Sequence, residues 1–154
     1  MAETSTDLLG LIQPAEDDAA WKDKVDPWAD KIDEIARQYI PFYIAGEAVD
    51  EEIILNGFKF NHDVDISGVS MFARSGPTGS ALQLDFLKDD AEQSKLVTIN
   101  AGSVHSFSAV TGLEYLQTPS VEELGLKIKN VGSTNPGAEI WGLIHYNVKP
   151  IPTP

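Results

Sequence analysis

The sequence predicts a mainly β protein: an antiparallel β-sandwich of the jelly-roll type, preceded by an extended N-terminal arm and a short helix. Three observations favour this fold. After residue 40, about eight segments alternate apolar and polar side chains or form short apolar runs. Turns rich in Gly and Pro separate these segments, and no helical period falls between them. Parallel sheets need crossover helices, so an antiparallel sandwich fits best.

The first element is an arm over residues 1–17, which show no period and contain Pro14. Its only apolar patch is LLGLI at residues 8–12. One interpretation is a frayed terminus, which is common at chain ends. The other is a tether that docks on something else through its apolar patch and the acidic stretch that follows. The residues expected to attach in that case are Leu8, Leu9, Leu11, Ile12, Glu16, Asp17 and Asp18.

The second element is a helix predicted over residues 18–40. Asp26 can cap a helix that has Pro27 in its first turn, although a kink at Pro27 is also compatible with the sequence, and Pro41 ends the helix. Apolar residues recur at steps of four and three, which is the spacing of a heptad seam. A short helix needs a partner in water, either its own domain or other copies around a symmetry axis. The seam comprises Trp21, Val25, Trp28, Ile32, Ile35 and Tyr39.

The remaining elements are strands. A change of face at Gly68 predicts a bulge in the third of them. In the strand from residue 124, Lys127 and Lys129 lie opposite an apolar face, and the stretch KDDAEQSK at residues 88–95 is expected to form a charged loop. A Pro-rich tail, residues 149–154, is expected to be extended. The strands are expected near residues 41–45, 52–60, 64–73, 82–86, 95–99, 103–110, 113–117, 124–131 and 138–148.

Charge divides the chain in the same way. The formal net charge is −13, and residues 1–52 hold 14 of the 24 acidic residues but only 4 of the 11 basic ones. This imbalance places a boundary near residue 50 and, with the patterns above, divides the chain into 1–17, 18–40, 41–148 and 149–154. Such an acidic chain is not expected to bind nucleic acid or an anionic membrane surface. No apolar run reaches the ~18 residues of a membrane-spanning helix.

We find no catalytic or metal-binding motif in the sequence. There is no cysteine, so disulfides and thiolate metal sites are excluded. The three histidines, His62, His105 and His145, are far apart in strand-like segments, and a structural role is favoured over metal binding. The sequence therefore predicts a protein that is not an enzyme and that needs no cofactor.

Residues 61–65 alternate polar and acidic positions like the start of a calcium-binding loop, in the order Asn61, Asp63, Asp65. Ile66 stands where that loop needs glycine, and Phe72 stands where it needs glutamate, so acids on the wet face of a strand are the preferred interpretation.

Trp141 lies on the face of the last strand opposite Ile140 and Ile144. Two interpretations stay open: an exposed ring that could contact a sugar, or core packing in a strand buried on both faces.

The β half resembles a sandwich domain found in structural proteins of tailed-phage virions, over roughly residues 41–148. The resemblance is carried by SGPTGSALQLDFLKDD, VTINAGS and KNVGSTNPGAEIWGLIHYNV, and it rests mainly on turn residues. The N-terminal part, with its Leu-Gly-Leu segment, Pro14, acidic stretch and Trp21, is similar to the leader of such proteins. One departure is that the loop after the alternating strand usually contains a short Asn-Gly turn, where this chain has KDDAEQSK.

The resemblance implies a virion protein, assembled in the host cytoplasm, that displays its β domain on the capsid surface. In the first hypothesis it is a head decoration or cement protein, expected as a trimer, that attaches to the major capsid protein or another virion protein through its N-terminal segment. In the second it is a tail or receptor-binding protein that attaches the phage to host glycans. A third hypothesis, from another class, is a sugar-binding or sugar-active jelly roll unrelated to phage.

Overall fold

The computed structural model describes residues 4–6, 11–13 and 37–150, in two units that comprise residues 1–37 and 38–154. In the first unit, strand β1 (Thr4–Thr6) pairs antiparallel with β2 (Leu11–Gln13), in a register that places Thr6 opposite Leu11. These two segments are the described part of the expected arm, whose other residues lie outside the described ones.

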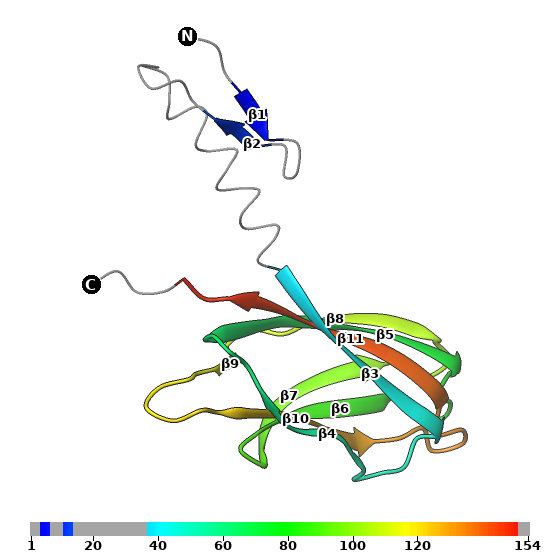
Figure 1. The fold of residues 1–154 in the computed structure, drawn as a ribbon. Helices are drawn as coiled ribbons and strands as arrows, with labels where there is room; N and C mark the ends of the chain where they lie inside the picture. The colour runs from blue at the N-terminus through cyan, green and yellow to red at the C-terminus, as the bar shows by residue number, and fades with distance from the viewer. Residues whose placement is uncertain (1–3, 7–10, 14–36, 151–154) are drawn as a thin grey trace. The chain divides into compact units, whose positions relative to one another are not determined.

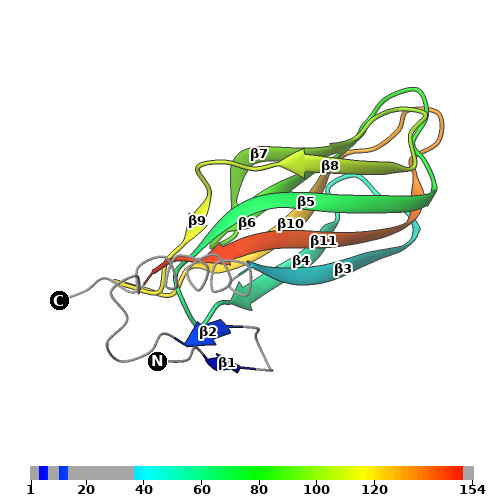
Figure 2. The ribbon, with the colours of Figure 1, turned by 90° about the horizontal axis from the view of Figure 1, so that it is seen from above.

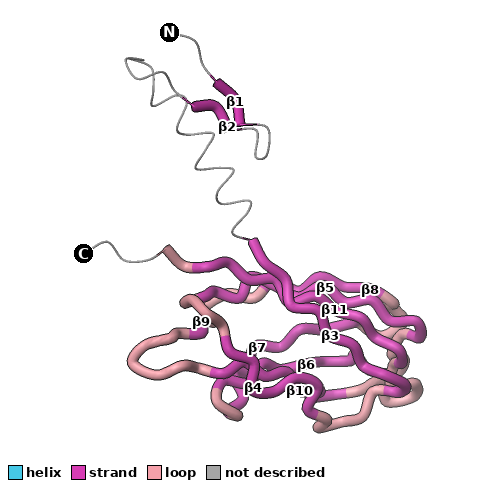
Figure 3. The backbone as a smooth tube through the Cα atoms, viewed as in Figure 1, coloured by secondary structure: helices cyan, strands magenta, loops and turns pink. Residues whose placement is uncertain are grey.

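Nine strands make up the second unit, and no helix occurs among the described residues (Figures 1 and 3). The agreement with the expected strands is close, since all nine begin within four residues of the expected position. The strands are β3 (Arg37–Glu47), β4 (Ile53–Lys59), β5 (Val64–Ser75), β6 (Leu82–Lys88), β7 (Ala91–Ile99), β8 (His105–Ala109), β9 (Glu114–Tyr115), β10 (Glu123–Asn130) and β11 (Ala138–Val148).

The strands form two antiparallel sheets, which are the upper and lower layers of Figure 1. One sheet has the order β3-β11-β5-β8, with β9 paired to β5, and the other has the order β4-β10-β6-β7 (Figure 2). If the two-residue β9 is left out, the other eight strands of the sandwich can be counted from one to eight along the chain, starting at β3. In this count one sheet has the order 1-8-3-6 and the other has the order 2-7-4-5. This is the strand order of a jelly roll, so the predicted β-sandwich is confirmed.

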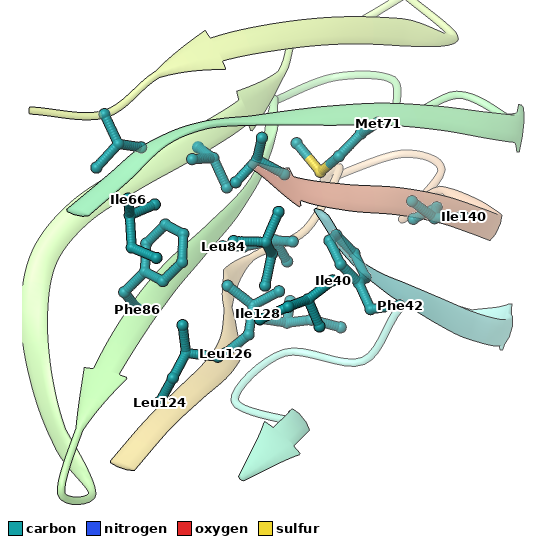
Figure 4. Close-up of a cluster of buried hydrophobic side chains, with 14 of the residues drawn as sticks. Ile40, Phe42, Ile66, Met71, Leu84, Phe86, Leu124, Leu126, Ile128 and Ile140 are labelled. Atoms are coloured by element: carbon teal, nitrogen blue, oxygen red, sulfur yellow. The ribbon is translucent and has the colours of Figure 1, made fainter. Parts of the chain in front are cut away.

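The core lies between the two sheets (Figure 4). Leu84 and Phe86 of β6 meet Ile66 and Met71 of β5, and none of these four side chains is more than 3% exposed. The alternation that predicted the strands is thus the alternation of core and outer face. The strand β10 follows the same rule, with Leu124, Leu126 and Ile128 fully buried and its lysines on the outer face.

The bulge predicted at Gly68 is confirmed. His145 pairs with Gly68, whereas its neighbour Tyr146 pairs with Ile66, so Ser67 is an extra residue on β5. Because one extra residue reverses the alternation, Val69 and Met71 face the core beyond the bulge, as Val64 and Ile66 do before it.

The prediction of a charged loop at residues 88–95 is wrong. Lys88 pairs with Ala91, so only Asp89 and Asp90 connect β6 to β7, with φ angles of 49° and 68°. Two successive positive φ angles are typical of the type I′ hairpin turn, in which Asn-Gly is the usual sequence. Two aspartates adopt the same backbone here, because short polar side chains tolerate the left-handed region better than bulky ones do.

The prediction that the helix extends to residue 40 is also wrong. Residues 37–40 belong to β3 and not to a helix, and Pro41 lies inside this strand instead of ending a helix. Proline is tolerated there because β3 is an edge strand of its sheet. The rest of the predicted helix, residues 18–36, lies outside the described residues.

Candidate functional site

The outer face of the β3-β11-β5-β8 sheet carries a group of exposed apolar side chains, which we call the aromatic face. Trp141 of β11 is 47% exposed, and Phe107 of β8 is 64% exposed. Because side chains alternate along a strand, these point away from the core. Pairing between strands brings them close together, since Phe72 lies opposite Trp141, and Ser70 lies opposite both Leu143 and Phe107. The aromatic face comprises Tyr39, Tyr43, Phe72, Phe107, Trp141 and Leu143.

Three rings form a row across the strands. Tyr43 stacks on Trp141 with ring centroids 5.3 Å apart, and Phe72 lies 6.1 Å from Trp141 with its ring tilted by 37°. Since β11 lies between β3 and β5, the indole ring is held between its two neighbours. Aromatic pairs at these distances contribute about 0.5–1.5 kcal/mol each beyond burial, so the row is expected to be rigid.

A shallow groove of about 330 Å³ lies beside this row. Pro41 and Leu143 line one part of it, and Phe72 and Trp141 line another, with Ser70 and the backbone of Gly142 between them. The lining is almost entirely apolar, which favours an apolar group as its occupant.

A second group of rings surrounds His145. Its ring lies 4.8 Å from that of Tyr39 and 5.7 Å from that of Phe107, both edge to face, and its Nε2 is hydrogen-bonded to the Ser70 hydroxyl at 2.7 Å. Burial among these groups lowers the pKa of His145 below its ordinary value, so the imidazole is neutral at pH 7. The centre of the aromatic face is therefore uncharged.

Charges begin only at the ends of the aromatic face. Asp65 lies at one end of β5 and Arg74 at the other, and Glu139 lies at the start of β11. The cross-strand rows between them contain no carboxylate, in a chain whose net charge is −13.

The outer face of the other sheet is different, because it carries an ion-pair network. Lys127 bonds to Glu51 and Glu92, and Lys129 bonds to Glu92 at 2.9 Å. Hydrogen bonds from Lys127 are the largest cause of the lowered pKa of both glutamates, and those from the glutamates raise the pKa of Lys127. This face carries paired charges, so the aromatic face is the better candidate for a contact surface.

The turn residues that carry the resemblance come together in a second feature, which we call the turn cluster. Thr78 bonds through its N–H to the carbonyl of Asn135 at 2.9 Å, and its carbonyl accepts the N–H of Thr134 at 3.0 Å. The N–H of Gly102 bonds to the carbonyl of Pro77 at 2.7 Å. Three turns from distant parts of the chain thus hold one another, which gives these residues a structural role.

Glycine is required in the turn cluster. A Cβ atom at Gly132 would lie 1.8 Å from the carbonyl oxygen of Asn135, and one at Gly76 would lie 2.2 Å from that of Ser103. Both positions are closed by backbone atoms, which cannot move aside. The glycines are therefore determined by packing between turns and not by a ligand.

Few of the residues predicted to attach or to oligomerise lie in the described part of the chain. Tyr39 lies on β3 in the aromatic face, and so it does not continue a helical seam. Leu11 and Ile12 lie on β2. The others lie outside the described residues, namely Trp21, Val25, Trp28, Ile32, Ile35, Leu8, Leu9, Glu16, Asp17 and Asp18.

The acidic series at residues 61–65 holds loops together. The Asp63 carboxylate accepts a hydrogen bond from the backbone N–H of Gln117 at 2.8 Å, and the backbone carbonyl of Asp63 accepts one from the N–H of Lys149. The ammonium group of Lys149 forms ion pairs with Asp65 and Glu114. Within the described part of the chain, no group of three or more His, Asp or Glu side chains is placed to hold a metal ion.

Sequence reasoning singled out Trp141 but missed the other members of the aromatic face. A usable pattern was present, because β11 alternates Ile140 and Ile144 on one parity with Trp141 and Leu143 on the other. Of the two interpretations of Trp141, the structure supports the exposed ring, since the side chain is about half exposed.

Comparison with known proteins adds no identity: no family model matches the chain, and no curated protein matches it. Among the described residues, no helix is both long and apolar enough to cross a membrane.

Proposed function

We propose that this chain is a non-enzymatic structural protein of a tailed-phage virion, which decorates and cements the capsid through its N-terminal segment. The observation that carries the proposal is the turn cluster, in which the residues that resemble phage virion domains interlock at one end of a jelly roll. Jelly rolls also build viral capsid proteins and lectins, so the fold is compatible with display on a particle.

The division of the chain supports separate roles for its two parts. The β unit, residues 38–154, has its own core, and acidic residues are denser before it, with 10 among the first 37 residues against 14 among the 117 that follow. In this proposal, the segment before β3 attaches to the major capsid protein or another virion protein, and the sandwich is exposed on the capsid surface. Acidic groups on a basic groove would also speed association and make it sensitive to salt.

Cementing has a simple energetic basis. A protein that binds only the assembled shell stabilises it by RT ln(1 + [L]/Kd), about 2.7 kcal/mol per site at a hundredfold excess over Kd. Repeated over many sites, modest binding is enough to oppose the pressure of packaged DNA. The seam of residues 21–35 would gather the copies into a trimer.

The test compares virions with and without this protein in a heat-release assay for packaged DNA. Particles that lack it should release DNA at a lower temperature, and deletion of residues 1–17 should reproduce the defect. Heads that are equally heat-resistant in all three cases contradict cementing. The copy number per virion is an independent check, since decoration requires hundreds of copies.

A second candidate function is attachment to host glycans as a tail or receptor-binding protein, and the exposed rings of the aromatic face favour it. It predicts a few to a few tens of copies per virion. It also predicts poor adsorption to cells by particles that lack the protein, with their DNA retained normally on heating.

A further inference from the structure

We infer that the aromatic face is a contact surface between two copies of this chain, packed sheet against sheet. The inference goes beyond the virion role and does not depend on it, because the purified protein can test it. Four observations carry it: the size of the exposed apolar surface, its shape, the distribution of charge and the hydrogen bonding of its polar groups.

The exposed area is that of an interface. Aromatic side chains present ~150–250 Å² each, so five half-exposed rings leave roughly 500 Å² of ring surface on one copy. A single exposed patch on a monomer is typically 300–600 Å² and often functional. With Leu143, Pro41 and the surrounding backbone, the area approaches the ~800 Å² that each partner buries in a standard interface.

The face combines an exposed row of rings with a groove. The row consists of Tyr43, Trp141 and Phe72, and the apolar groove is lined by Trp141, Phe72, Pro41 and Leu143. In a face-to-face pair, exposed rings of each copy can enter the groove of the other, which is the reciprocal pattern of a two-fold contact. Sheets packed in this way lie ~10 Å apart with their side chains interdigitated.

Charge selects this face for a second copy. Two chains of net charge −13 repel each other, and the repulsion is least where no carboxylate lies between them. The central rows of the aromatic face meet this condition, whereas a contact through the opposite sheet would have to desolvate the ion-paired Glu51 and Glu92. A strongly basic partner would instead require acidic groups within the face.

A sugar fits the face less well. Sugars stack on open ring faces, but one face of the Trp141 ring is covered by Tyr43, and Phe72 lies on its other side. Sugars also need polar side chains for their hydroxyl groups. Ser70 and His145, at the centre of the face, are bonded to each other, which leaves His105, opposite Phe72, as the polar side chain beside the ring row.

The experiment uses the absence of cysteine in this chain. Leu143→Cys is introduced into the full-length protein, and disulfide formation is catalysed by copper phenanthroline. Val121→Cys, in the loop between β9 and β10, is the control because Val121 is as exposed as Leu143, at 45% against 40%. We expect covalent dimers from the Leu143→Cys protein only, and their loss when Trp141→Glu is added.

Sedimentation provides the second measurement. Trp141→Glu and, separately, Phe72→Lys should weaken self-association at least ~30-fold, as expected for loss of a hot spot, with Val121→Glu unchanged. Added NaCl should strengthen the association, because it screens repulsion between acidic chains. Urea unfolding of each variant verifies that the fold is retained.

Two outcomes overturn the inference. The first is that the Leu143→Cys protein cross-links no more than the Val121→Cys protein, as expected if the chain assembles only through residues 18–36. The second is that the protein shows no cross-link at Leu143 but binds cellohexaose or maltohexaose, and that Trp141→Glu abolishes this binding, as expected if the face binds sugars.

Discussion

At the scale of single residues, the sandwich depends on a few polar groups that satisfy buried backbone. Asp85 is 2% exposed on β6, and its carboxylate accepts the N–H groups of Ser94 at 3.1 Å and Lys95 at 2.8 Å. These two residues lie where the β6–β7 register shifts, and Ser94 has a φ of 55°. Tyr115 plays a similar part, because its buried hydroxyl donates to the carbonyl of Leu87 at 2.7 Å.

Asp85→Ala should lower the free energy of unfolding by about 2 kcal/mol, because it leaves two N–H groups of the bulge without their acceptor. Removal of one carboxylate from a chain of net charge −13 would by itself stabilise the fold slightly. A loss measured by urea unfolding therefore reports the hydrogen bonds. Asp50→Ala, at an exposed turn position, is the control and should change little; equal effects of the two substitutions contradict the assigned role.

His145 should make the fold sensitive to mild acid. Its pKa is lowered by burial in the folded state, so the unfolded chain takes up the proton first as pH falls. The contribution of the neutral His145 to the free energy of unfolding is complete above the ordinary pKa of about 6.5. It is lost as pH falls through the lower pKa of the folded state. The free energy of unfolding should therefore decrease from pH 7 to pH 5, and it should decrease less in the His145→Gln variant. Identical pH profiles for both proteins contradict this assignment.

At the scale of elements, turns and edges decide the arrangement of the strands. The turn cluster joins the segments before β6, before β8 and before β11, and so it positions strands of both sheets. The edge strand β3 contains Pro41, and proline on an edge strand disfavours pairing with another chain. Assembly through the open sheet face is therefore favoured over assembly through this edge.

Gly79→Ala should destabilise the fold by about 3 kcal/mol. Gly79 has a φ of +85°, and a Cβ there would lie 2.3 Å from the Ser133 Oγ and 2.9 Å from the backbone N of Thr134. Gly102→Ala is a matched control, because Gly102 has a φ of +81° with nothing within 4 Å of its Cβ position. It should cost only about 1 kcal/mol, the backbone strain alone. Equal melting temperatures for the two variants would show that the turn cluster adds no packing constraint.

At the scale of the whole molecule, the jelly roll has a closed core of its own, and the aromatic face is the part of the surface best suited to contact another molecule. The boundary expected between residues 40 and 41 lies instead at residues 37–38, and it matters because Ile40 is part of the core. The sandwich thus includes the residues that seemed, from their spacing, to end a helix.

A fragment of residues 37–154 should fold by itself and unfold cooperatively, but it should no longer bind heads that lack this protein. A fragment of residues 41–154 should be less stable by about 2 kcal/mol or more, because it loses the buried Ile40 side chain. Thermal unfolding and co-sedimentation with heads measure the two effects. Binding of the 37–154 fragment as tight as that of the full chain would place the attachment surface on the sandwich.

The sequence by itself determined the strands and the core. Period-two alternation states directly which side chains share a face, so the apolar face opposite Lys127 and Lys129 was identified correctly, and it is buried. The bulge at Gly68 was visible because the alternation changes parity there. Local patterns were sufficient wherever neighbouring residues alone decide the structure.

Only the tertiary structure decided three other features. Tyr39 fits a helical seam by spacing, but pairing within a sheet outweighs such a local preference. The hairpin at Asp89 and Asp90 depends on the register between β6 and β7, which composition does not reveal. Alternation also placed Trp141 on the outer face without showing what surrounds it. The aromatic face exists because β3, β11, β5 and β8 become neighbours, and the order of strands is a property of the whole fold.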